Sequence, residues 1–240
     1  MTGAPIIELA QVTKTYRTGG ARGAEYRAVK GVDLLVTAGE MVAITGPSGS
    51  GKTTIINLIA GIDRPTAGTV TVDGCRLDQL NEEQLAVWRG RTIGIVFQFF
   101  QLMPTLTAAE NAALPLDLAR RGPARERKDV ASRHLAAVGL SDRGDRLPLE
   151  LSGGEQQRVA IARAMACGPP ILLGDEPTGN LDSAMTQDMF KLLKGLNESG
   201  TTVVYVTHDQ ALAAKAGRIV SVRDGQIVAD TGAPRIREEP

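Results

Sequence analysis

The feature that most constrains the fold of this chain is a glycine-rich loop between an apolar strand and an apolar helix. Residues 46–53 match the phosphate-loop pattern G-x-x-x-x-G-K-[ST] without a mismatch. Residues 41–45 have the composition of a short buried strand, and residues 54–60 that of an apolar helix. In such a turn, backbone N–H groups converge on a phosphate, and the positive end of the helix dipole points to the same place. The pattern predicts a nucleoside-triphosphate site.

Two side chains of this loop supply chemistry that backbone groups cannot. Lys52 adds a full positive charge, and the Thr53 hydroxyl is placed to bind Mg²⁺ on the β- and γ-phosphates. A chance match in an ordinary glycine- and serine-rich loop is the alternative, and the flanking strand and helix argue against it. The residues that we expect to contact the nucleotide here are Gly46, Pro47, Ser48, Gly49, Ser50, Gly51, Lys52, Thr53 and Thr54.

The bulk properties exclude several classes of protein. The 240 residues suit one large domain or two closely packed subdomains. Basic and acidic residues both number 27, and this balance argues against a dedicated nucleic-acid binder. The N-terminal residues lack a secretory pattern, and no run approaches the ~18 consecutive apolar residues of a membrane span. We therefore expect a soluble cytoplasmic protein, in which Cys75 and Cys167 are small buried residues rather than metal ligands.

Strand and helix patterns alternate along the chain, with one helical interruption. Strand patterns occupy most of 6–45, apart from a glycine-rich loop at 17–24, and recur at 69–74, 93–97, 171–173, 202–206, 218–222 and 226–228. Helices are expected at 82–88, at 185–196 and within 107–166, where His134 is expected on the surface. The predicted organisation is a nucleotide-binding domain over 6–232, with a core of 1–98 and 167–232, a helical subdomain at 99–166 and a flexible tail at 233–240.

A second element of the expected site is a pair of carboxylates after an apolar strand. Asp175 and Glu176 follow residues 171–174, and ligands of open α/β sheets bind at the carboxyl ends of the strands. Asp175 is expected to hold Mg²⁺ through its water shell. Glu176 is expected to polarise the attacking water as a general base. Acidic residues often end strands, so this pattern gains its weight from the phosphate loop.

Residues 151–155 have the sequence Leu-Ser-Gly-Gly-Glu at the start of a predicted helix. They predict both a helix-terminal anion site and a capping box between Ser152 and Glu155. They also match the signature of ATP-binding-cassette ATPases, whose order of motifs the chain resembles from Val12 to Val228. The resemblance implies an α/β phosphate-loop core with an antiparallel β subdomain and a helical insert. It further implies that two copies sandwich two ATP molecules, so that Ser152, Gly153, Gly154 and Glu155 of one copy contact the ATP held by the other.

Further positions resemble functional residues of that family. Gln98 resembles the glutamine that contacts Mg²⁺ and water, and His208 resembles the histidine that contacts the γ-phosphate. Residues 180–182 (Asn-Leu-Asp) resemble a loop that crosses the dimer interface. Tyr16 resembles the aromatic residue that stacks on adenine, although tyrosine is also common in strands that bind no ligand.

Finer patterns resemble the lipoprotein-release and macrolide-exporter branch of the family. Residues 96–104 (Val-Phe-Gln-Phe-Phe-Gln-Leu-Met-Pro) and 175–183 have the form typical of that branch, although Gly174 stands where alanine is commoner. The resemblance implies an integral membrane permease of the FtsX-like type as partner, attachment to the inner face of the cell membrane, and export or extracytoplasmic mechanical work. The apolar cluster expected either to receive the permease or to pack in the core is Phe99, Phe100, Leu102 and Met103.

Two other functions compete with this interpretation. Cassette ATPases of DNA repair or translation carry tandem cassettes, coiled-coil arms or zinc modules, and the sequence has none of these patterns. A regulatory cassette that controls a cell-envelope or division complex without transport would use the same ATPase residues, so this alternative stays open. The transported molecule cannot be read from the chain, because substrate contacts in this family belong to the permease.

Overall fold

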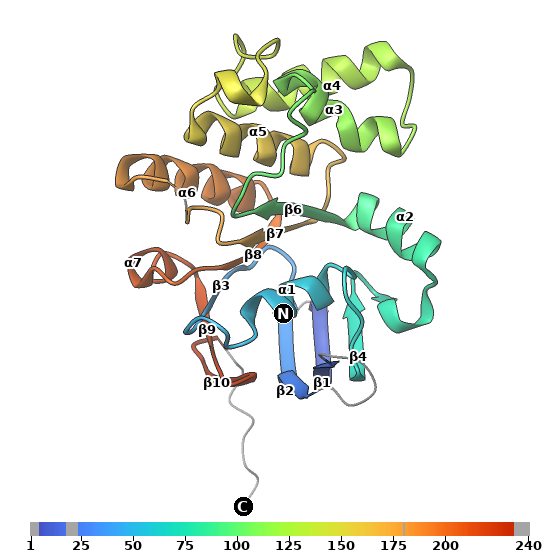
Figure 1. Ribbon diagram of the computed structural model, residues 1–240, viewed down its shortest axis with the longest axis vertical. Helices are drawn as coiled ribbons and strands as arrows, with labels where there is room; N and C mark the ends of the chain where they lie inside the picture. The colour runs from blue at the N-terminus through green and yellow to red at the C-terminus, as the bar shows by residue number, and fades with distance from the viewer. Residues whose placement is uncertain (1–4, 18–23, 180, 233–240) are drawn as a thin grey trace, which may run out of the picture.

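A computed structural model of the chain describes residues 5–17, 24–179 and 181–232. Most of the predicted glycine-rich loop, Asn180 and the predicted flexible tail lie outside these residues. Figure 1 shows a small sheet at one end of the molecule, a larger sheet across its middle and a group of helices at the other end.

The smaller sheet is antiparallel, with its strands in the order β2-β1-β4-β5. The side chains of Val32, Leu34 and Val36 all lie in the core, as their alternation predicts, because alternate residues of a strand face the same side. The strand bounds are Pro5–Arg17 for β1, Glu25–Thr37 for β2, Ala67–Val72 for β4 and Cys75–Arg76 for β5.

The larger sheet has the strand order β10-β9-β3-β8-β7-β6. Its strands are parallel except β10, which pairs with β9 in the antiparallel sense. Every residue of β3 and β8 is buried, as expected for a parallel sheet that is covered on both faces. The bounds are Met41–Thr45 for β3, Ile93–Phe97 for β6, Ile171–Asp175 for β7, Thr202–Val206 for β8, Arg218–Arg223 for β9 and Gln226–Asp230 for β10.

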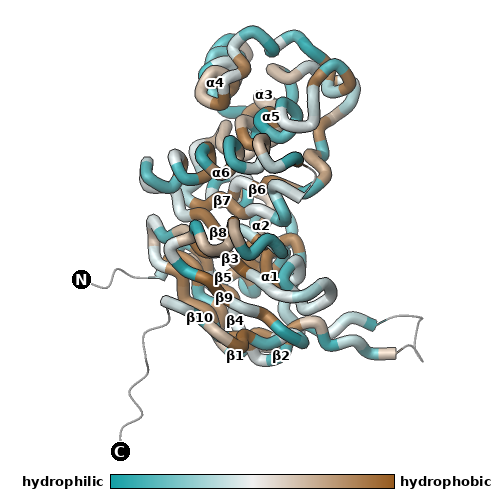
Figure 2. Tube along the Cα trace, turned by 90° about the vertical axis from the view of Figure 1, so that its left-hand side faces the viewer, coloured by the Kyte–Doolittle hydropathy of each residue, from teal (hydrophilic) through white to brown (hydrophobic). Residues whose placement is uncertain are grey.

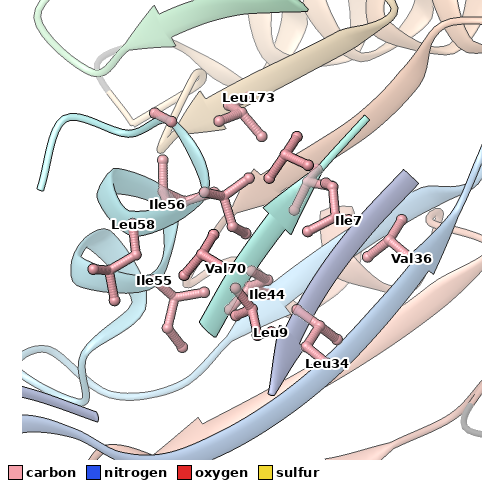
Figure 3. Packing of buried hydrophobic residues seen from close by; sticks show 14 of the residues in the cluster. Ile7, Leu9, Leu34, Val36, Ile44, Ile55, Ile56, Leu58, Val70 and Leu173 are labelled. Atoms are coloured by element: carbon pink, nitrogen blue, oxygen red, sulfur yellow. The ribbon is translucent and has the colours of Figure 1, made fainter. Parts of the chain in front are cut away.

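Helix α1 (Lys52–Ile59) fills the space between the two sheets. Its apolar side chains belong to one hydrophobic cluster with residues of both sheets. Figure 3 shows Ile55 and Ile56 of α1 close to Val70 of β4 and Ile44 of β3. The helix that follows the phosphate loop is therefore held from two sides.

Most of the remaining helices pack on the other face of the larger sheet, whereas Leu85 of the helix at 82–92 belongs to the first cluster and Trp88 packs against it. A second hydrophobic cluster joins that face to α3–α6, and includes Leu135, Ile161 and Tyr205. Figure 2 shows the hydrophobic stretches gathered in the central strands, whereas hydrophilic residues dominate the outer turns around α4. The helices are α2 (Glu82–Thr92), α3 (Ala108–Leu118), α4 (Ala124–Ala137), α5 (Gly153–Met165), α6 (Ser183–Glu198) and α7 (Gln210–Ala213), with short 3₁₀ turns at Leu77–Gln79 and Pro148–Glu150.

Most predicted elements are present, with small differences in their bounds. The phosphate-loop helix begins at Lys52 rather than at residue 54, and β7 continues beyond residue 173 to Asp175. The division into a core and a helical subdomain at 99–166 stays a prediction.

Two expectations about burial are wrong. Cys75 and Cys167 are only partly buried, because Cys75 lies in a two-residue edge strand and Cys167 lies just beyond the end of α5. His134 is not a surface residue but is half-buried. It lines a cavity of about 180 Å³ among α4, α5 and α6, because it lies on the same side of the helix as the buried residues Ala131 and Val138, three residues before it and four after it.

Candidate functional site

The phosphate loop leaves the larger sheet at the carboxyl end of β3 and passes between both sheets. Gly46 has a φ of 147°, and a Cβ atom there would lie 2.0 Å from the carbonyl oxygen of Val222 in β9. Gly51 has a φ of 101°, and its Cβ atom would lie 2.4 Å from the carbonyl oxygen of Ala28 in β2. Both distances are shorter than any real Cβ contact, so the path of the loop requires glycine at these two positions.

Two polar side chains of this loop, those of Lys52 and Ser50, are buried. The buried Lys52 ammonium group donates hydrogen bonds to the carbonyl oxygens of Gly46 at 2.9 Å and Pro47 at 2.8 Å. The Ser50 hydroxyl is buried and has no hydrogen-bond partner among the described residues. A buried hydroxyl without a partner costs stability until something satisfies it. The Ser50 hydroxyl is therefore a hydrogen-bonding group of the loop that the described side chains and backbone leave unsatisfied.

Strand β7 delivers two carboxylates to the same edge of the sheet. Asp175 ends the strand, and the Thr53 hydroxyl donates to its Oδ1 atom at 3.1 Å. Burial raises the pKa of Asp175 above its ordinary value, although the hydrogen bond from Thr53 opposes this shift. Glu176 has a φ of 49°, a left-handed conformation that costs a non-glycine residue roughly 1 kcal/mol. Backbone strain of this kind often occurs at functional sites.

Gln98 and His208 approach these carboxylates from the ends of two other strands, β6 and β8. The Nδ1 atom of His208 lies 3.2 Å from Oε2 of Glu176, and about two thirds of the His208 side chain is exposed, at 68%. A Cβ atom at Gly179 would lie 3.0 Å from the Gln98 amide nitrogen and 3.2 Å from the Glu176 carboxylate. The Gln98 amide and the Glu176 carboxylate therefore converge on one point.

These groups surround an open cavity of about 440 Å³, a volume in the range of small-molecule sites. The cavity brings the phosphate loop together with Gln98, both carboxylates and His208. Of the predicted loop residues, Gly46, Pro47 and Ser50 do not reach its surface. The lining residues are Tyr26, Ala28, Ser48, Gly49, Gly51, Lys52, Thr53, Thr54, Gln98, Asp175, Glu176 and His208.

Tyr26 is a lining residue that the sequence pattern did not single out. Its hydroxyl donates to the carbonyl oxygen of Gly49 at 2.8 Å, which ties β2 to the phosphate loop. Tyr26 stands opposite Tyr16 in the β1–β2 ladder, but Tyr16 itself does not line the cavity. The Tyr16 hydroxyl donates instead to Asp63 at 2.7 Å. The position of Tyr26 depends on the register of two strands across a glycine-rich loop, and no local pattern reveals that register.

The signature residues Ser152, Gly153, Gly154 and Glu155 do not line this cavity either. They form the first turn of α5, which packs on the face of the larger sheet opposite α1 (Figure 1). The predicted capping box is present, since the Glu155 N–H donates to the Ser152 hydroxyl at 3.3 Å and the Ser152 N–H donates to the Glu155 carboxylate at 2.9 Å. The hydrogen bond from the Ser152 backbone is the main cause of the lowered pKa of Glu155.

The neighbouring segment that the family resemblance links to a dimer interface is described in part. Asp182 caps α6, because its side chain accepts a hydrogen bond from the Met185 N–H at 2.8 Å. Leu181 packs against the second hydrophobic cluster.

The oxygen atoms at the end of β7 fit a hard divalent cation. Thr53 and Asp175 present oxygen ligands of the kind that Mg²⁺ prefers, and the raised pKa of Asp175 indicates a carboxylate charge that a cation would stabilise. Within the described residues, no group of three or more His, Cys, Asp or Glu side chains could hold a metal ion alone.

This combination of a phosphate loop, strand-end carboxylates and an open cavity between them defines a nucleotide-binding α/β protein of the phosphate-loop class. Comparison with known families narrows the class, because residues 29–179 match the family described as ABC transporter. The chain belongs to this family and is an ATPase cassette of it, with the predicted α/β fold.

Relatives of this chain fall into two size groups. It is 47% identical over 227 residues to the lipoprotein-releasing system ATP-binding protein LolD of Anaeromyxobacter dehalogenans, covering 94% of each chain. It is 45% identical over 231 residues to the macrolide export ATP-binding/permease protein MacB of Brucella melitensis, covering 96% of this chain but only 35% of the relative. The chain thus spans about a third of the length of the MacB relatives.

Solved structures give the same family. The dimeric structure of MJ0796, described as a bacterial ABC transporter cassette, has a TM-score of 0.86 and 45% sequence identity, over 93% of this chain and 97% of the other. A second structure of MJ0796 is dimeric in a post-hydrolysis state with ADP and Pi bound, at a TM-score of 0.86 and 44% identity. Among the described residues of the present chain, no helix has the length and apolar character needed to cross a membrane.

Proposed function

We propose that this chain is the ATP-driven subunit of a membrane transporter complex, and that two copies close around two ATP molecules to drive a permease. The observation that carries the proposal is the composition of the cavity. It contains the phosphate loop, Glu176 and His208, but the signature residues of the same copy lie away from it. A second copy supplies the missing side of the site, and the dimeric state of the related cassette MJ0796 supports this arrangement.

Within each half-site, the loop residues 46–54 hold the triphosphate. Lys52 has two carbonyl partners in the loop, and its charge neutralises phosphate oxygens when a nucleotide binds. Thr53, Asp175 and Gln98 hold Mg²⁺ beside the phosphates. When bound, Mg²⁺ lowers the negative charge on the phosphates that the attacking water must approach.

Glu176 accepts a proton from the attacking water, and His208 orients this carboxylate while it contacts the γ-phosphate. The 3.2 Å separation between His208 Nδ1 and Glu176 supports the pairing. Efficient proton transfer requires a base within hydrogen-bond reach of the water, and the cavity is open in front of Glu176.

ATP binding closes the dimer, because each γ-phosphate adds contacts with Ser152, Gly153, Gly154 and Glu155 of the opposite copy. Hydrolysis removes these contacts and the dimer opens. The binding energy of the nucleotide is thereby converted into a motion that a membrane partner follows.

The partner is an integral membrane permease of the FtsX-like type, which places the chain in the cytoplasm against the inner face of the membrane. Phe99 and Met103 support a docking role, since they are 72% and 45% exposed and lie one and five residues after Gln98. Phe100 and Leu102 are half-buried, and Leu102 packs against the second hydrophobic cluster. Phe99 and Met103 are therefore available to a partner, whereas Leu102 contributes to packing.

Similarity to LolD and MacB supports export or extracytoplasmic mechanical work as the outcome. The alternative is a regulatory cassette that controls an envelope or division complex without transport. Co-purification from detergent extracts, followed by identification of what the external domain of the membrane partner binds, separates these two functions.

Substitution of the proposed base tests the mechanism. Glu176→Gln is expected to lower ATP turnover at least about 100-fold, the usual contribution of a positioned base, while ATP binding persists. With ATP, the variant accumulates as a dimer in light scattering, and adding Ser152→Ala abolishes that dimer. Glu198→Gln, on the surface of α6, serves as the matched control. Normal turnover by Glu176→Gln would refute the role assigned to this residue.

A further inference from the structure

A polar cluster beside the phosphate-loop helix surrounds Tyr16. The Lys14 ammonium group and the Tyr16 hydroxyl both donate hydrogen bonds to the carboxylate of Asp63, the second of them at 2.7 Å. Lys14 also donates to the carbonyl oxygen of Arg64 at 2.9 Å, and the Arg64 N–H donates to the Asp63 carboxylate at 2.8 Å. Both Asp63 oxygens are therefore occupied, and the cluster joins β1 to the segment that follows α1.

The same cluster determines which face of the Tyr16 ring is available. Lys14 and Tyr16 are two residues apart on β1, so their side chains project from the same face of the sheet. The Lys14 nitrogen lies 4.9 Å from the centroid of the Tyr16 ring, at the distance of a cation–π contact. One ring face is therefore covered by Lys14, and a planar group can stack only on the other.

Two contacts connect Tyr16 to the wall of the nucleotide cavity. The side chain of Thr54, a lining residue of the phosphate-loop helix, lies near enough to the Tyr16 hydroxyl to lower its pKa, against the larger effects of burial and Asp63. Tyr26, another lining residue, is the direct partner of Tyr16 across the β1–β2 ladder, and directly opposite residues of an antiparallel pair project from the same face. Tyr16 therefore adjoins two residues of the cavity wall without lining the cavity itself.

The charge states of the cluster agree with these contacts. Burial raises the pKa of the Tyr16 hydroxyl, and its hydrogen bond to Asp63 adds to the shift, so the hydroxyl keeps the proton that it donates. Burial alone would raise the pKa of Asp63, but hydrogen bonds from Lys14 and Tyr16 hold it below its ordinary value. The carboxylate therefore remains an acceptor for both donors at neutral pH.

From this geometry we infer that Lys14 and Asp63 are positioning residues for the nucleobase. They hold the Tyr16 ring at the edge of the cavity, with its uncovered face toward the base of the bound nucleotide. The inference rests on the proposed function, because it takes Tyr16 as the stacking residue. It adds two residues that contact Tyr16 rather than the nucleotide. It also predicts that this cluster raises the affinity for a nucleotide above the affinity for a bare polyphosphate.

The experiment compares two ligands by calorimetry: a non-hydrolysable ATP analogue and inorganic tripolyphosphate. Asp63→Asn and Lys14→Met are each expected to weaken binding of the ATP analogue about three- to tenfold, as the loss of one charge-assisted contact predicts. Binding of tripolyphosphate stays unchanged, because the phosphate loop is intact. Unchanged tripolyphosphate binding also shows that the variants are folded. Asp78→Asn, which removes a surface carboxylate paired with Arg76, is the matched control and leaves both affinities unchanged.

Two Tyr16 variants separate failure of this inference from failure of the proposed function. Tyr16→Ala is expected to lose more ATP affinity than Asp63→Asn, and Tyr16→Phe to match Asp63→Asn, because it keeps the ring but lacks the hydroxyl. If Tyr16→Ala leaves the ratio of the ATP-analogue affinity to the tripolyphosphate affinity unchanged, Tyr16 does not stack on the base. Both the stacking role of Tyr16 and the positioning role of Lys14 and Asp63 are then wrong. If Tyr16→Ala lowers the ratio but Asp63→Asn and Lys14→Met do not, only the positioning role is overturned.

Discussion

Replacing Arg218 with methionine should destabilise the protein more than any surface ion-pair variant. Arg218 begins β9, the strand whose carbonyl at Val222 limits the space at the phosphate loop. Only 8% of its side chain is exposed. The guanidinium group donates two hydrogen bonds to Asp230, at 2.8 and 2.6 Å, one to Glu40 at 3.0 Å and one to the carbonyl oxygen of Leu35 at 2.8 Å. This residue therefore fastens the larger sheet to β2 of the smaller one.

The size of the effect follows from these contacts. Methionine has nearly the volume of arginine, so the main loss is the charge that faces the Asp230 and Glu40 carboxylates. Removing one partner of a buried ion pair costs about 3–5 kcal/mol. For a chain of this size each kcal/mol shifts the melting temperature by about 2–4 °C, so a decrease on the order of 10 °C is expected. Arg218→Lys should lose less, because it keeps the charge but not the paired geometry.

Thermal unfolding followed by circular dichroism measures this difference. The control is Arg146→Met, which breaks an ion pair with Glu150 at 3.2 Å, where the two side chains are 56% and 45% exposed. Exposed pairs contribute less than about 1 kcal/mol, so the control should melt within a few degrees of the unmodified chain. Equal melting temperatures for the two variants would refute the view that the buried Arg218 contacts join the sheets.

Two further predictions concern the helices. Burial lowers the pKa of His134 in the folded state. Such a group contributes stability above its unfolded pKa, and this stability is lost as the pH falls through the folded pKa. Between neutral and mildly acidic pH, the His134→Gln variant should therefore lose less thermal stability than the unmodified chain. Equal losses of stability in the variant and the unmodified chain would contradict the predicted direction of this effect. Arg163 of α5 donates hydrogen bonds to the carbonyl oxygens of Gln101 at 2.5 Å and Phe100 at 2.8 Å. Arg163→Met should therefore speed chymotrypsin cleavage of this segment several-fold, since local opening costs less without the two bonds. Arg89→Met, which removes a similar bond to the carbonyl oxygen of Gly61 just after α1, should not change that cleavage rate.

The elements of the core could be predicted from the sequence because they depend on local patterns. Strands β6 and β8 have the predicted bounds, since each is a short apolar run ended by polar residues. The phosphate loop, Asp175 and Glu176 were predictable for the same reason, because a motif and a strand end are adjacent in sequence. The helix α1 starts two residues early because Gly51, in a left-handed conformation, ends the loop one residue before Lys52.

The remaining features depend on contacts between distant segments. Tyr26 reaches the cavity only through the β1–β2 register, and Asp63 meets Lys14 and Tyr16 across about fifty residues of chain. Arg218 has no local signal for burial, because its partners come from β10, from β2 and from the turn before β3. Periodicity and motif spacing cannot reveal such pairings.

The central claim is that one copy of this chain holds an incomplete catalytic site. ATP turnover per molecule, measured over a wide range of protein concentration beside the mass distribution in analytical ultracentrifugation, tests it most directly. The account predicts that turnover per molecule rises with concentration and follows the fraction of dimer. Full, concentration-independent turnover in samples that sediment as monomers would contradict it.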